Sequence, residues 1–355
     1  MLSLAQGLAN ILGFGTVSYM EDEVMDENER GWSGAEVVRK RIFFTDGSSK
    51  TMIFKTADRK ERCVMVRLTE QGHLYTPAAF AADVTSEESM WIAMEDFGKP
   101  GVSATEDEVW LRKVAEALCL IHVSNMGKQK ELSWLPVADE TYWKEVVTTL
   151  SVDHFERKIM QCPAFAAEFG KYLPMLREQG EKFIGDMTAL CNEESCMTLT
   201  HGDLQMRDGA HVYNCDGMPG IIDFGFCRYA PFYIDLVGWF SSTDAKIYYD
   251  VLRGKGIRVS SREFEERVKT AFRYIGFLYL FPSMADWQEG PTKQKGQRLL
   301  QALHIILTGE FPERRRAYSR ELFQRLIREH EKITDRKENV WIEMHGDFNT
   351  SRTTR

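Results

Sequence analysis

Two short β-prone runs that each end at an aspartate place the strongest constraint on how this chain can fold. The first, residues 198–200, leads into His201-Gly202-Asp203, and the second, residues 220–222, stops at Asp223-Phe224-Gly225. A polar loop separates the two runs, which is typical of a hairpin-like pair of strands. Strands paired in this way would hold Asp203 and Asp223 close together.

Two aspartates at neighbouring strand ends suit the chemistry of phosphoryl transfer. One can accept the proton of an attacking hydroxyl, while the other holds a magnesium ion that neutralises the transferring phosphate. Each motif alone has a plainer interpretation, because Asp and Gly also satisfy the backbone of ordinary turns. The order, separation and strand context of the two motifs together favour phosphoryl transfer over two unrelated turns.

The segment resembles the catalytic core of the aminoglycoside phosphotransferase and choline kinase-like superfamily, whose members are relatives of the protein kinases. The family pattern is H-G-D-x-x-x-x-N, then I-D-F or I-D-W, then a downstream D-L. This chain has His201-Gly202-Asp203, then Ile222-Asp223-Phe224, then Asp235-Leu236. It carries Asp208 where the family has a metal-binding asparagine, and Gln205 where many members have a second histidine.

The resemblance implies a role for each of these residues. Asp203 would act as the general base, and Asp208 and Asp223 would bind Mg²⁺ beside ATP. Asp235 would brace the catalytic loop, because its position at the start of a helix suits a carboxylate that caps backbone amides. His201 is expected to support the same loop from behind Asp203.

The first part of the chain predicts a three-stranded meander after a helix-like opening. Residues 17–20 begin one strand, residues 35–45 form a second, and a third, residues 51–55, follows the tight-turn signal Asp46-Gly47. In a kinase-like lobe the first turn, Gly31-Trp32-Ser33-Gly34, would cover the ATP phosphates, since glycine lets backbone amides approach oxygen atoms closely. The turn lacks the full G-x-G-x-x-G pattern, and an ordinary hairpin turn would look the same.

Four residues around this sheet are assigned to nucleotide binding by the resemblance. Lys55 ends the third strand like the family's strand lysine, which contacts the α- and β-phosphates. Glu61 opens an amphipathic helical pattern and would pair with Lys55, although a surface salt bridge is the plainer alternative. The buried strand that ends near residue 97 resembles the interlobe hinge, where the carbonyl of Glu95 and the amide of Phe97 would hold adenine.

Composition and charge exclude several classes of protein. At 355 residues with 43% hydrophobic residues, the chain suits a folded, two-lobed protein. The net charge of −8 and the pI near 5.6 argue against nucleic acid as the main partner, because phosphate backbones are bound by clustered Lys and Arg. The longest apolar run, residues 274–281, falls far short of the ~20 residues of a membrane-spanning helix, so no membrane association is expected.

Seven cysteines show no C-x-x-C spacing, and an odd number cannot form a complete set of disulfides. Reduced thiols and a cytoplasmic location are therefore expected. The apolar start of the chain lacks the positively charged region and the cleavage site of a signal peptide. These patterns leave the oligomeric state open.

The remainder of the chain predicts mainly helices. Residues 106–124 carry apolar residues at helical spacing and include His122, which is expected to pack in the core. Amphipathic blocks follow between residues 139 and 192, and helices continue beyond Phe240 to about Arg336. Arg314-Arg315-Arg316 is expected to be a solvated helix face. A second His-Gly-Asp, at residues 345–347, is interpreted as a coincidence.

These observations predict an α+β chain with the bilobal, protein kinase-like fold. Residues 1–95 would form a β-rich nucleotide-binding lobe, and residues 96–355 a mainly helical lobe for catalysis and substrate binding. The expected activity transfers the γ-phosphoryl group of ATP to the hydroxyl of a small molecule, with Mg²⁺ as cofactor. No A-P-E segment follows Asp223, which argues against a protein kinase. The alternative is a kinase-fold pseudoenzyme that only binds nucleotide or ligand, and Asp208 is its main support.

The acceptor substrate stays open at the level of sequence. Choline-like amines, aminoglycosides, other antibiotics, sugars, and hydroxylated lipids or steroids all fit the family. A cage of aromatic and acidic side chains could bind a cationic amine, although the same side chains could equally be core residues. The candidates for such a cage are Glu140, Tyr142, Trp143, Tyr233, Trp239 and Trp287.

Overall fold

The structure, a computed structural model, describes residues 1–25, 35–72, 75–86, 90–98, 108–204, 211–288 and 293–310. Several residues interpreted from the sequence lie outside these ranges. They are Gly31-Trp32-Ser33-Gly34, Gln205, Asp208, Arg314-Arg315-Arg316 and His345-Gly346-Asp347.

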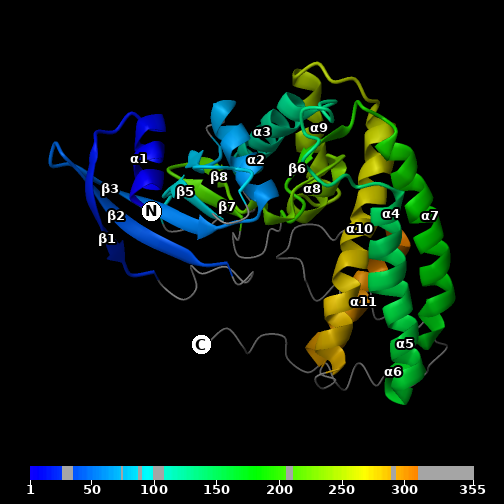
Figure 1. Cartoon of the computed structure of the whole chain (residues 1–355). Coiled ribbons are helices and arrows are strands. Elements are labelled where there is room, and N and C mark those ends of the chain that lie inside the picture. Colours follow the sequence, from blue (N-terminus) through cyan, green and yellow to red (C-terminus); the bar gives the residue numbers. More distant parts are fainter. Residues whose placement is uncertain are drawn as a thin grey trace. The chain divides into compact units, whose positions relative to one another are not determined.

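The N-terminal part contains a five-stranded antiparallel sheet in the order β1-β2-β3-β5-β4 (Figure 1). The predicted three-stranded meander is confirmed, because β1 pairs with β2 and β2 with β3. Asp46 makes the turn after β2 by accepting from the amide and hydroxyl of Ser48, and Gly47 follows with φ +87°. The strands are β1 (Val17–Glu23), β2 (Val37–Phe44), β3 (Ser49–Thr56), β4 (Ala79–Phe80) and β5 (Trp91–Glu95).

Helix α1 (Leu2–Ile11) supplies one wall of the core beside this sheet. Its buried residues pack with apolar side chains from β2, β3 and β5. The fit is close, because a Cβ added to Gly7 would lie only 2.2 Å from the Phe80 ring. The core cluster contains Leu4, Ala5, Leu8, Ala9, Ile42, Phe44, Met52, Phe54 and Ala93.

Helix α2 (Arg59–Glu70) follows β3 and begins at a side-chain cap. Asp58 accepts a hydrogen bond of 2.8 Å from the amide of Glu61, which satisfies one of the free amides of the first turn. The buried side chain of Arg62 donates to the carbonyls of Ala57 and Ser86. The start of α2 is thereby fixed to the end of β3 and to the segment before β5.

The two aspartate-bearing runs do not pair with each other, so the predicted hairpin between them is wrong. β6 (Met197–Thr200) pairs with β9 (Arg228–Pro231), while β8 (Met218–Ile221) pairs with β7 (Val212–Cys215). The loop between the runs contains β7, whose two-residue connection Asp216-Gly217 adopts positive φ and brings β8 back along it. Each of the two runs therefore pairs with a different strand, and they do not pair with one another.

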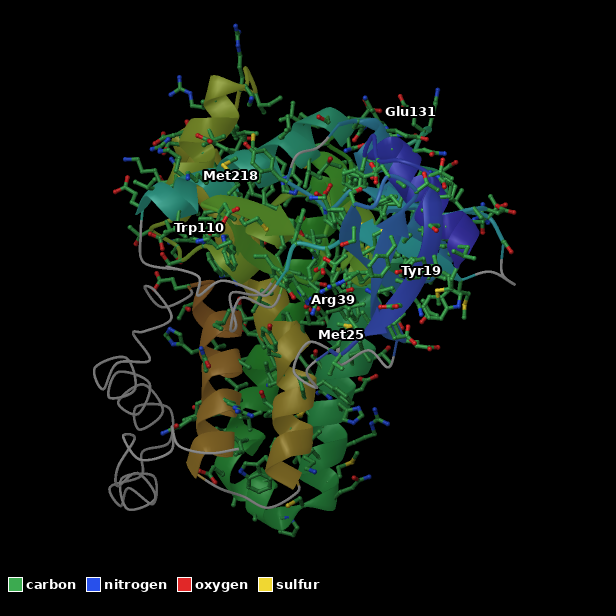
Figure 2. The ribbon with its side chains drawn as sticks, turned by 90° about the vertical axis from the view of Figure 1, so that its left-hand side faces the viewer. Tyr19, Met25, Arg39, Trp110, Glu131 and Met218 are labelled. Carbon is green, nitrogen blue, oxygen red and sulfur yellow. The ribbon has the colours of Figure 1, made fainter. Side chains whose placement is uncertain are left out.

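Helix α3 (Glu108–Asn125) and helix α8 (Tyr233–Trp239) accompany these strands. Thr198 of β6 donates to the carbonyl of His122 of α3 at 2.7 Å, and Lys113 of α3 donates to Gly217 in the β7–β8 connection. His122 is fully buried, as expected for a core histidine. Figure 2 labels Trp110 on α3 and Met218 on β8.

The described residues group into two compact units. One contains the described residues of Met1–Pro136 and Thr198–Trp239, and the other those of Val137–Met197 and Phe240–Arg355. The division at residue 95 expected from the sequence stays a prediction. No helix in the described part of the chain has both the length and the apolar character that a bilayer crossing needs.

The second unit is helical and is built around aromatic side chains. Trp143 meets Phe183 and Tyr274 edge to face, and Trp287 meets Phe165 in the same way. The helical elements in the described part of this unit are α4 (Glu140–Lys144), the π-helix η2 (Glu145–Val152), α5 (Asp153–Gln161), α6 (Pro163–Phe169), the 3₁₀ turn η3 (Gly170–Tyr172), α7 (Leu173–Cys191), α9 (Ala245–Gly254), α10 (Ser261–Gln288) and α11 (Lys293–Thr308).

The aromatic side chains proposed as an amine cage are mostly core residues. Trp143, Tyr233, Trp239 and Trp287 are each at most 5% exposed. Glu140 instead forms an exposed ion pair with Lys144 one helical turn later. The core interpretation of these four aromatics is therefore confirmed.

Leu8→Ala tests the contribution of α1 to the core. Leu8 is fully buried, so its truncation should lower the free energy of unfolding by about 2–5 kcal/mol. Leu2→Ala is the matched control on the same helix, because Leu2 is 52% exposed and should cost less than about 0.5 kcal/mol. Urea denaturation measures the stability of both variants, and hydrogen exchange of peptides from β2 and β3 measures the local effect on the sheet. Equal effects of Leu8→Ala and Leu2→Ala would show that α1 does not support the sheet.

Candidate functional site

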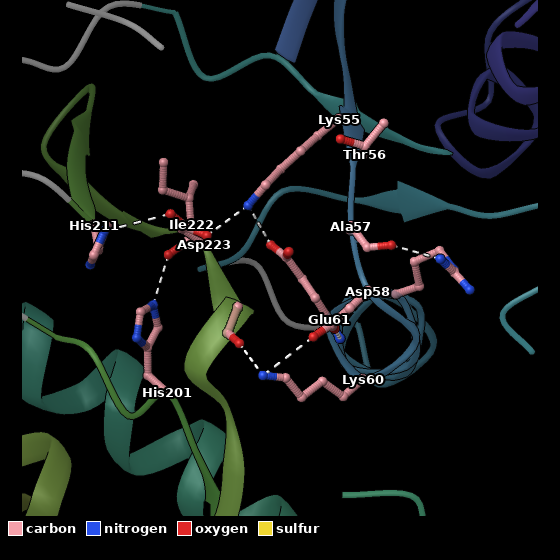
Figure 3. Close-up of polar contacts among 12 residues, drawn as sticks. Lys55, Thr56, Ala57, Asp58, Lys60, Glu61, His201, His211, Ile222 and Asp223 are labelled. Carbon is pink, nitrogen blue, oxygen red and sulfur yellow. Dashed lines mark hydrogen bonds and ion pairs between the residues drawn. The ribbon is translucent and has the colours of Figure 1, made fainter. Parts of the chain in front are cut away.

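The ammonium of Lys55 lies between two carboxylates (Figure 3). Its Nζ is 2.7 Å from Oε1 of Glu61 and 2.6 Å from Oδ1 of Asp223. β3 supplies Lys55, α2 supplies Glu61, and Asp223 follows β8. The pair of Lys55 and Glu61 expected from the sequence is thus buried rather than on the surface, and Asp223 joins it.

Burial and charge act against each other in this triad. Burial alone would lower the pKa of Lys55, but the negative charges of Glu61 and Asp223 outweigh it and raise that pKa. Burial favours a higher pKa for Asp223, yet the neighbouring Lys55 ammonium lowers it. Burial dominates at Glu61 and raises its pKa in spite of Lys55. Lys55 therefore stays a cation and Asp223 an anion at neutral pH.

The turn that carries Asp223 has an unusual backbone. Asp223 adopts φ +65°, a left-handed conformation that costs a non-glycine residue of the order of 1–3 kcal/mol. Contacts on both sides hold it, because His201 Nε2 donates to the carbonyl of Ile222 at 2.7 Å and Lys60 donates to the carbonyl of Gly225. Such strain, when it is held by neighbours, is a common sign of a functional position.

Asp235 holds the loop that follows β6. Its two carboxylate oxygens accept from the amides of His201 and Gly202 at 2.7 and 2.8 Å, and Oδ2 also lies 3.0 Å from Nε2 of His122. The bracing contact expected for Asp235 is present. The amides that it caps belong to the loop after β6, as this bracing requires, and not to the first turn of α8.

Gly202 is required where the loop meets the segment after Asp223. It has φ +82°, and a Cβ at this position would lie 2.4 Å from the carbonyl oxygen of Phe226. A side chain would therefore clash with backbone that cannot rotate away. The His-Gly-Asp loop and the Asp-Phe-Gly segment pack directly on each other at this glycine.

His201 lies behind Asp203 as a neutral ring. The carbonyl of Ile222 can only accept, so Nε2 carries the hydrogen, and Nδ1 accepts at 3.3 Å from the amide of Asp203. Burial, with a smaller contribution from His211, lowers the pKa of His201 to about 4. The expected support of Asp203 by His201 is thus a hydrogen bond to the Asp203 backbone.

His211, which the sequence reasoning did not single out, lies between the two aspartates. Its Nδ1 is 2.6 Å from the carbonyl oxygen of Asp203, and its Nε2 is 3.7 Å from Oδ2 of Asp223. The available signal was its position in the loop between the two aspartate motifs, directly before β7. The backbone of Asp203 and the carboxylate of Asp223 are brought together through this ring.

The segment expected to bind adenine is held on both sides. The amide of Glu95 donates to Ala78 at 2.8 Å, and Asp96 forms a two-point ion pair at 2.8 and 3.4 Å with Arg39 of β2, which Figure 2 labels. The Phe97 ring lies against Gly220 of β8, where a Cβ would come within 2.6 Å of it. Whether Glu95 and Phe97 bind a nucleotide stays a prediction.

The predicted metal ligands are only partly described. No group of three or more His, Cys, Asp and Glu side chains within the described ranges is arranged to hold a metal ion. Asp223 is described and its side chain is about one third exposed, whereas Asp208 lies outside the described residues. Of the two predicted metal ligands, only Asp223 can therefore be placed in the described part of the chain.

The neutral state of His201 predicts a specific pH dependence of stability. Its pKa is about 4 in the folded chain and 6.5 ordinarily, so the unfolded chain binds more protons between these values. The contribution to stability is complete above pH 6.5 and is lost as the pH falls to 4, by about 3 kcal/mol. In urea titrations, the free energy of unfolding should fall between pH 7 and pH 4 by about 3 kcal/mol more in wild type than in His201→Gln. Parallel pH profiles would contradict the assignment.

The chain matches a model of one protein family over more than half of its length. The model describes the phosphotransferase enzyme family and matches residues 37–265, a range that contains Lys55, Asp203 and Asp223. A search of curated protein sequences found no match.

Several solved structures are similar to this chain at low sequence identity. Spectinomycin phosphotransferase APH(9)-Ia, solved with ADP and spectinomycin, is 11% identical with a TM-score of 0.52, over 83% of this chain and 94% of that chain. Macrolide 2'-phosphotransferase MphH from Brachybacterium faecium is 14% identical over 88% and 100% of the two chains, with a TM-score of 0.47. Plasmodium vivax ethanolamine kinase is 12% identical over 80% and 82%, with a TM-score of 0.49.

The likeness to the spectinomycin phosphotransferase confirms the predicted bilobal, kinase-like α+β fold. The family assignment rests on the separate match of the family model, which extends from β2 to the first turns of α10. This chain belongs to the phosphotransferase enzyme family.

Proposed function

We propose that this protein transfers the γ-phosphoryl group of ATP to a hydroxyl of a small molecule. The observation that carries the proposal is the buried Lys55 ammonium, 2.7 Å from Glu61 and 2.6 Å from Asp223. In kinase-like enzymes a strand lysine paired with a helix glutamate contacts the phosphates, and an aspartate after a nearby strand holds the metal. Membership in the phosphotransferase enzyme family supports the same chemistry.

Asp203 is the proposed general base. Its backbone is fixed at both ends, because the amide donates to His201 and the carbonyl accepts from His211. Asp235 restrains the two preceding amides as well. A carboxylate on a loop fixed in this way is suited to accept the proton of a hydroxyl without a search through many conformations.

Asp223 and Asp208 are the proposed ligands of Mg²⁺. Oδ1 of Asp223 pairs with Lys55. Oδ2 makes no hydrogen bond within the described residues and lies 3.7 Å from Nε2 of His211. A partly exposed carboxylate oxygen fits the preference of Mg²⁺ for hard oxygen donors. When bound, Mg²⁺ would neutralise charge on the phosphates.

The nucleotide would extend from the β5 segment to Lys55. The carbonyl of Glu95 and the amide of Phe97 would bind adenine, and Lys55, oriented by Glu61, would contact the phosphates. The ion pair between Asp96 and Arg39 fixes the backbone between these two adenine contacts. A fixed backbone reduces the conformational entropy that is lost on binding.

The acceptor is proposed to be a small hydroxylated molecule in the cytoplasm. The similar solved structures are those of proteins named for macrolides, spectinomycin and ethanolamine. Antibiotics and amino alcohols are therefore the first compounds to test. All seven cysteines are free thiols in the structure, which suits a reducing compartment.

Incubation with Mg²⁺ and ATP against a panel of amino alcohols, aminoglycosides, macrolides, sugars and sterols, with ADP as the readout, tests the proposal. ATP binding without ADP release from any acceptor would favour the pseudoenzyme instead.

Asp203→Asn tests the general base. The variant keeps the size of the side chain but cannot take a proton, so the rate of phosphoryl transfer should fall about 10²–10⁴-fold while ATP affinity stays unchanged. Asp216→Asn is the matched control, because Asp216 is exposed and its positive φ is one that Asn adopts readily. Transfer at the wild-type rate by Asp203→Asn would remove Asp203 from the mechanism.

Lys55→Met tests the phosphate contact. Both ATP affinity and transfer rate should fall, because the lysine would contact the phosphates before and during transfer. Lys50→Met on the same strand is the control, since Lys50 is exposed and its ammonium lies over the Phe14 ring. Isothermal titration with ATP and ADP release under the same conditions measure the two quantities. Equal values for Lys55→Met and Lys50→Met would show that Lys55 has only a structural role.

A further inference from the structure

The hydrogen bond of His211 fixes which of its nitrogens carries a proton. Nδ1 is 2.6 Å from the carbonyl oxygen of Asp203, and a carbonyl oxygen can only accept, so Nδ1 carries the hydrogen. In the neutral ring Nε2 is then left with a lone pair. His211 is therefore able to act as a ligand through Nε2.

That lone pair faces another acceptor. Nε2 of His211 is 3.7 Å from Oδ2 of Asp223 (Figure 3), too far for a hydrogen bond, which ends near ~3.2 Å. Bonds of about 2.0–2.2 Å from a shared metal ion to an imidazole nitrogen and a carboxylate oxygen span such a separation. The two acceptors are thus close enough to share one cation.

The described neighbours Lys55 and His201 engage other atoms. Lys55 is held at the other oxygen of Asp223, Oδ1, at 2.6 Å. His201, whose ring centroid is 5.4 Å from that of His211, cannot compete as a ligand because both its nitrogens are in hydrogen bonds. Among the described histidines of this loop, His211 alone has a nitrogen directed at Asp223.

We propose that His211 is a ligand of the divalent cation, which it shares with Asp223, and that it shifts the metal preference of the site from Mg²⁺ toward Mn²⁺. Imidazole nitrogen binds first-row transition metals well, whereas Mg²⁺ favours oxygen ligands. This inference rests on the proposed function, because two side chains do not complete a metal site and the phosphates of a bound nucleotide would supply further oxygens. His211 would thus add a nitrogen donor to an otherwise oxygen-based site.

His211→Asn separates the ligand from the structural contact. The amide nitrogen of Asn takes the place of Nδ1 and can still donate to the carbonyl of Asp203, but nothing replaces Nε2. His154→Asn is the matched control, because His154 is in α5 of the other compact unit and bonds to Arg157. Unfolding in urea should give similar stabilities for wild type and both variants.

The direct readout is the electron spin echo envelope modulation of Mn²⁺ bound with AMP-PNP. Wild type and His154→Asn should show modulation from a directly bound imidazole nitrogen, and His211→Asn should show none. In calorimetric titrations, the ratio of AMP-PNP affinity with Mn²⁺ to that with Mg²⁺ should fall about tenfold in His211→Asn only.

The possible outcomes distinguish this inference from the proposed function. If AMP-PNP binds with both cations but wild type shows no nitrogen modulation, the inference is overturned and the proposed function stands. The inference is also overturned, and the proposed function again stands, if His211 carries a second proton and pairs with Asp223 as an imidazolium. That ring cannot bind a metal. If AMP-PNP binds with neither cation, the proposed function fails and the inference fails with it.

Discussion

One buried cation, the ammonium of Lys55, connects β3, α2 and the turn after β8 within the first compact unit. Removing an ammonium from water costs several kcal/mol, and this cost is offset only by partners with good geometry. Glu61 and Asp223 supply two such contacts, from α2 and from the turn after β8. Any arrangement that displaced α2 or this turn would leave charge buried without compensation, so the sheet, the helix and the aspartate turn stabilise one another.

A second constraint is steric and acts between the two aspartate motifs. Asp223 is in a left-handed conformation, and Gly202 has no space for a side chain because the Phe226 carbonyl is so close. Asp235 fixes the amides on the far side of the same loop. Electrostatic pairing thus determines where Asp223 lies, and close backbone packing determines where Asp203 lies relative to it.

The sequence predicted features that depend on neighbouring residues better than those that depend on pairing at a distance. The hairpin of β2 and β3 follows from the Asp46-Gly47 turn, and Lys55 and Glu61 are only six positions apart, so one strand end and one helix start bring them together. The partners of β6 and β8 could not be read in the same way, because several short strands compete. His211 was missed because its significance comes from the Asp203 carbonyl, and no side-chain pattern encodes a backbone contact.

The position of Lys60 has a consequence for how this unit can move. Its ammonium donates to the carbonyl of Gly225 and lies 3.3 Å from the Asp58 carboxylate that caps α2 (Figure 3). Rotation of α2 away from the sheet would therefore pull on the aspartate turn through Lys60 as well as through Lys55. The helix and the turn are thus coupled through two lysines, and a displacement of one would be transmitted to the other.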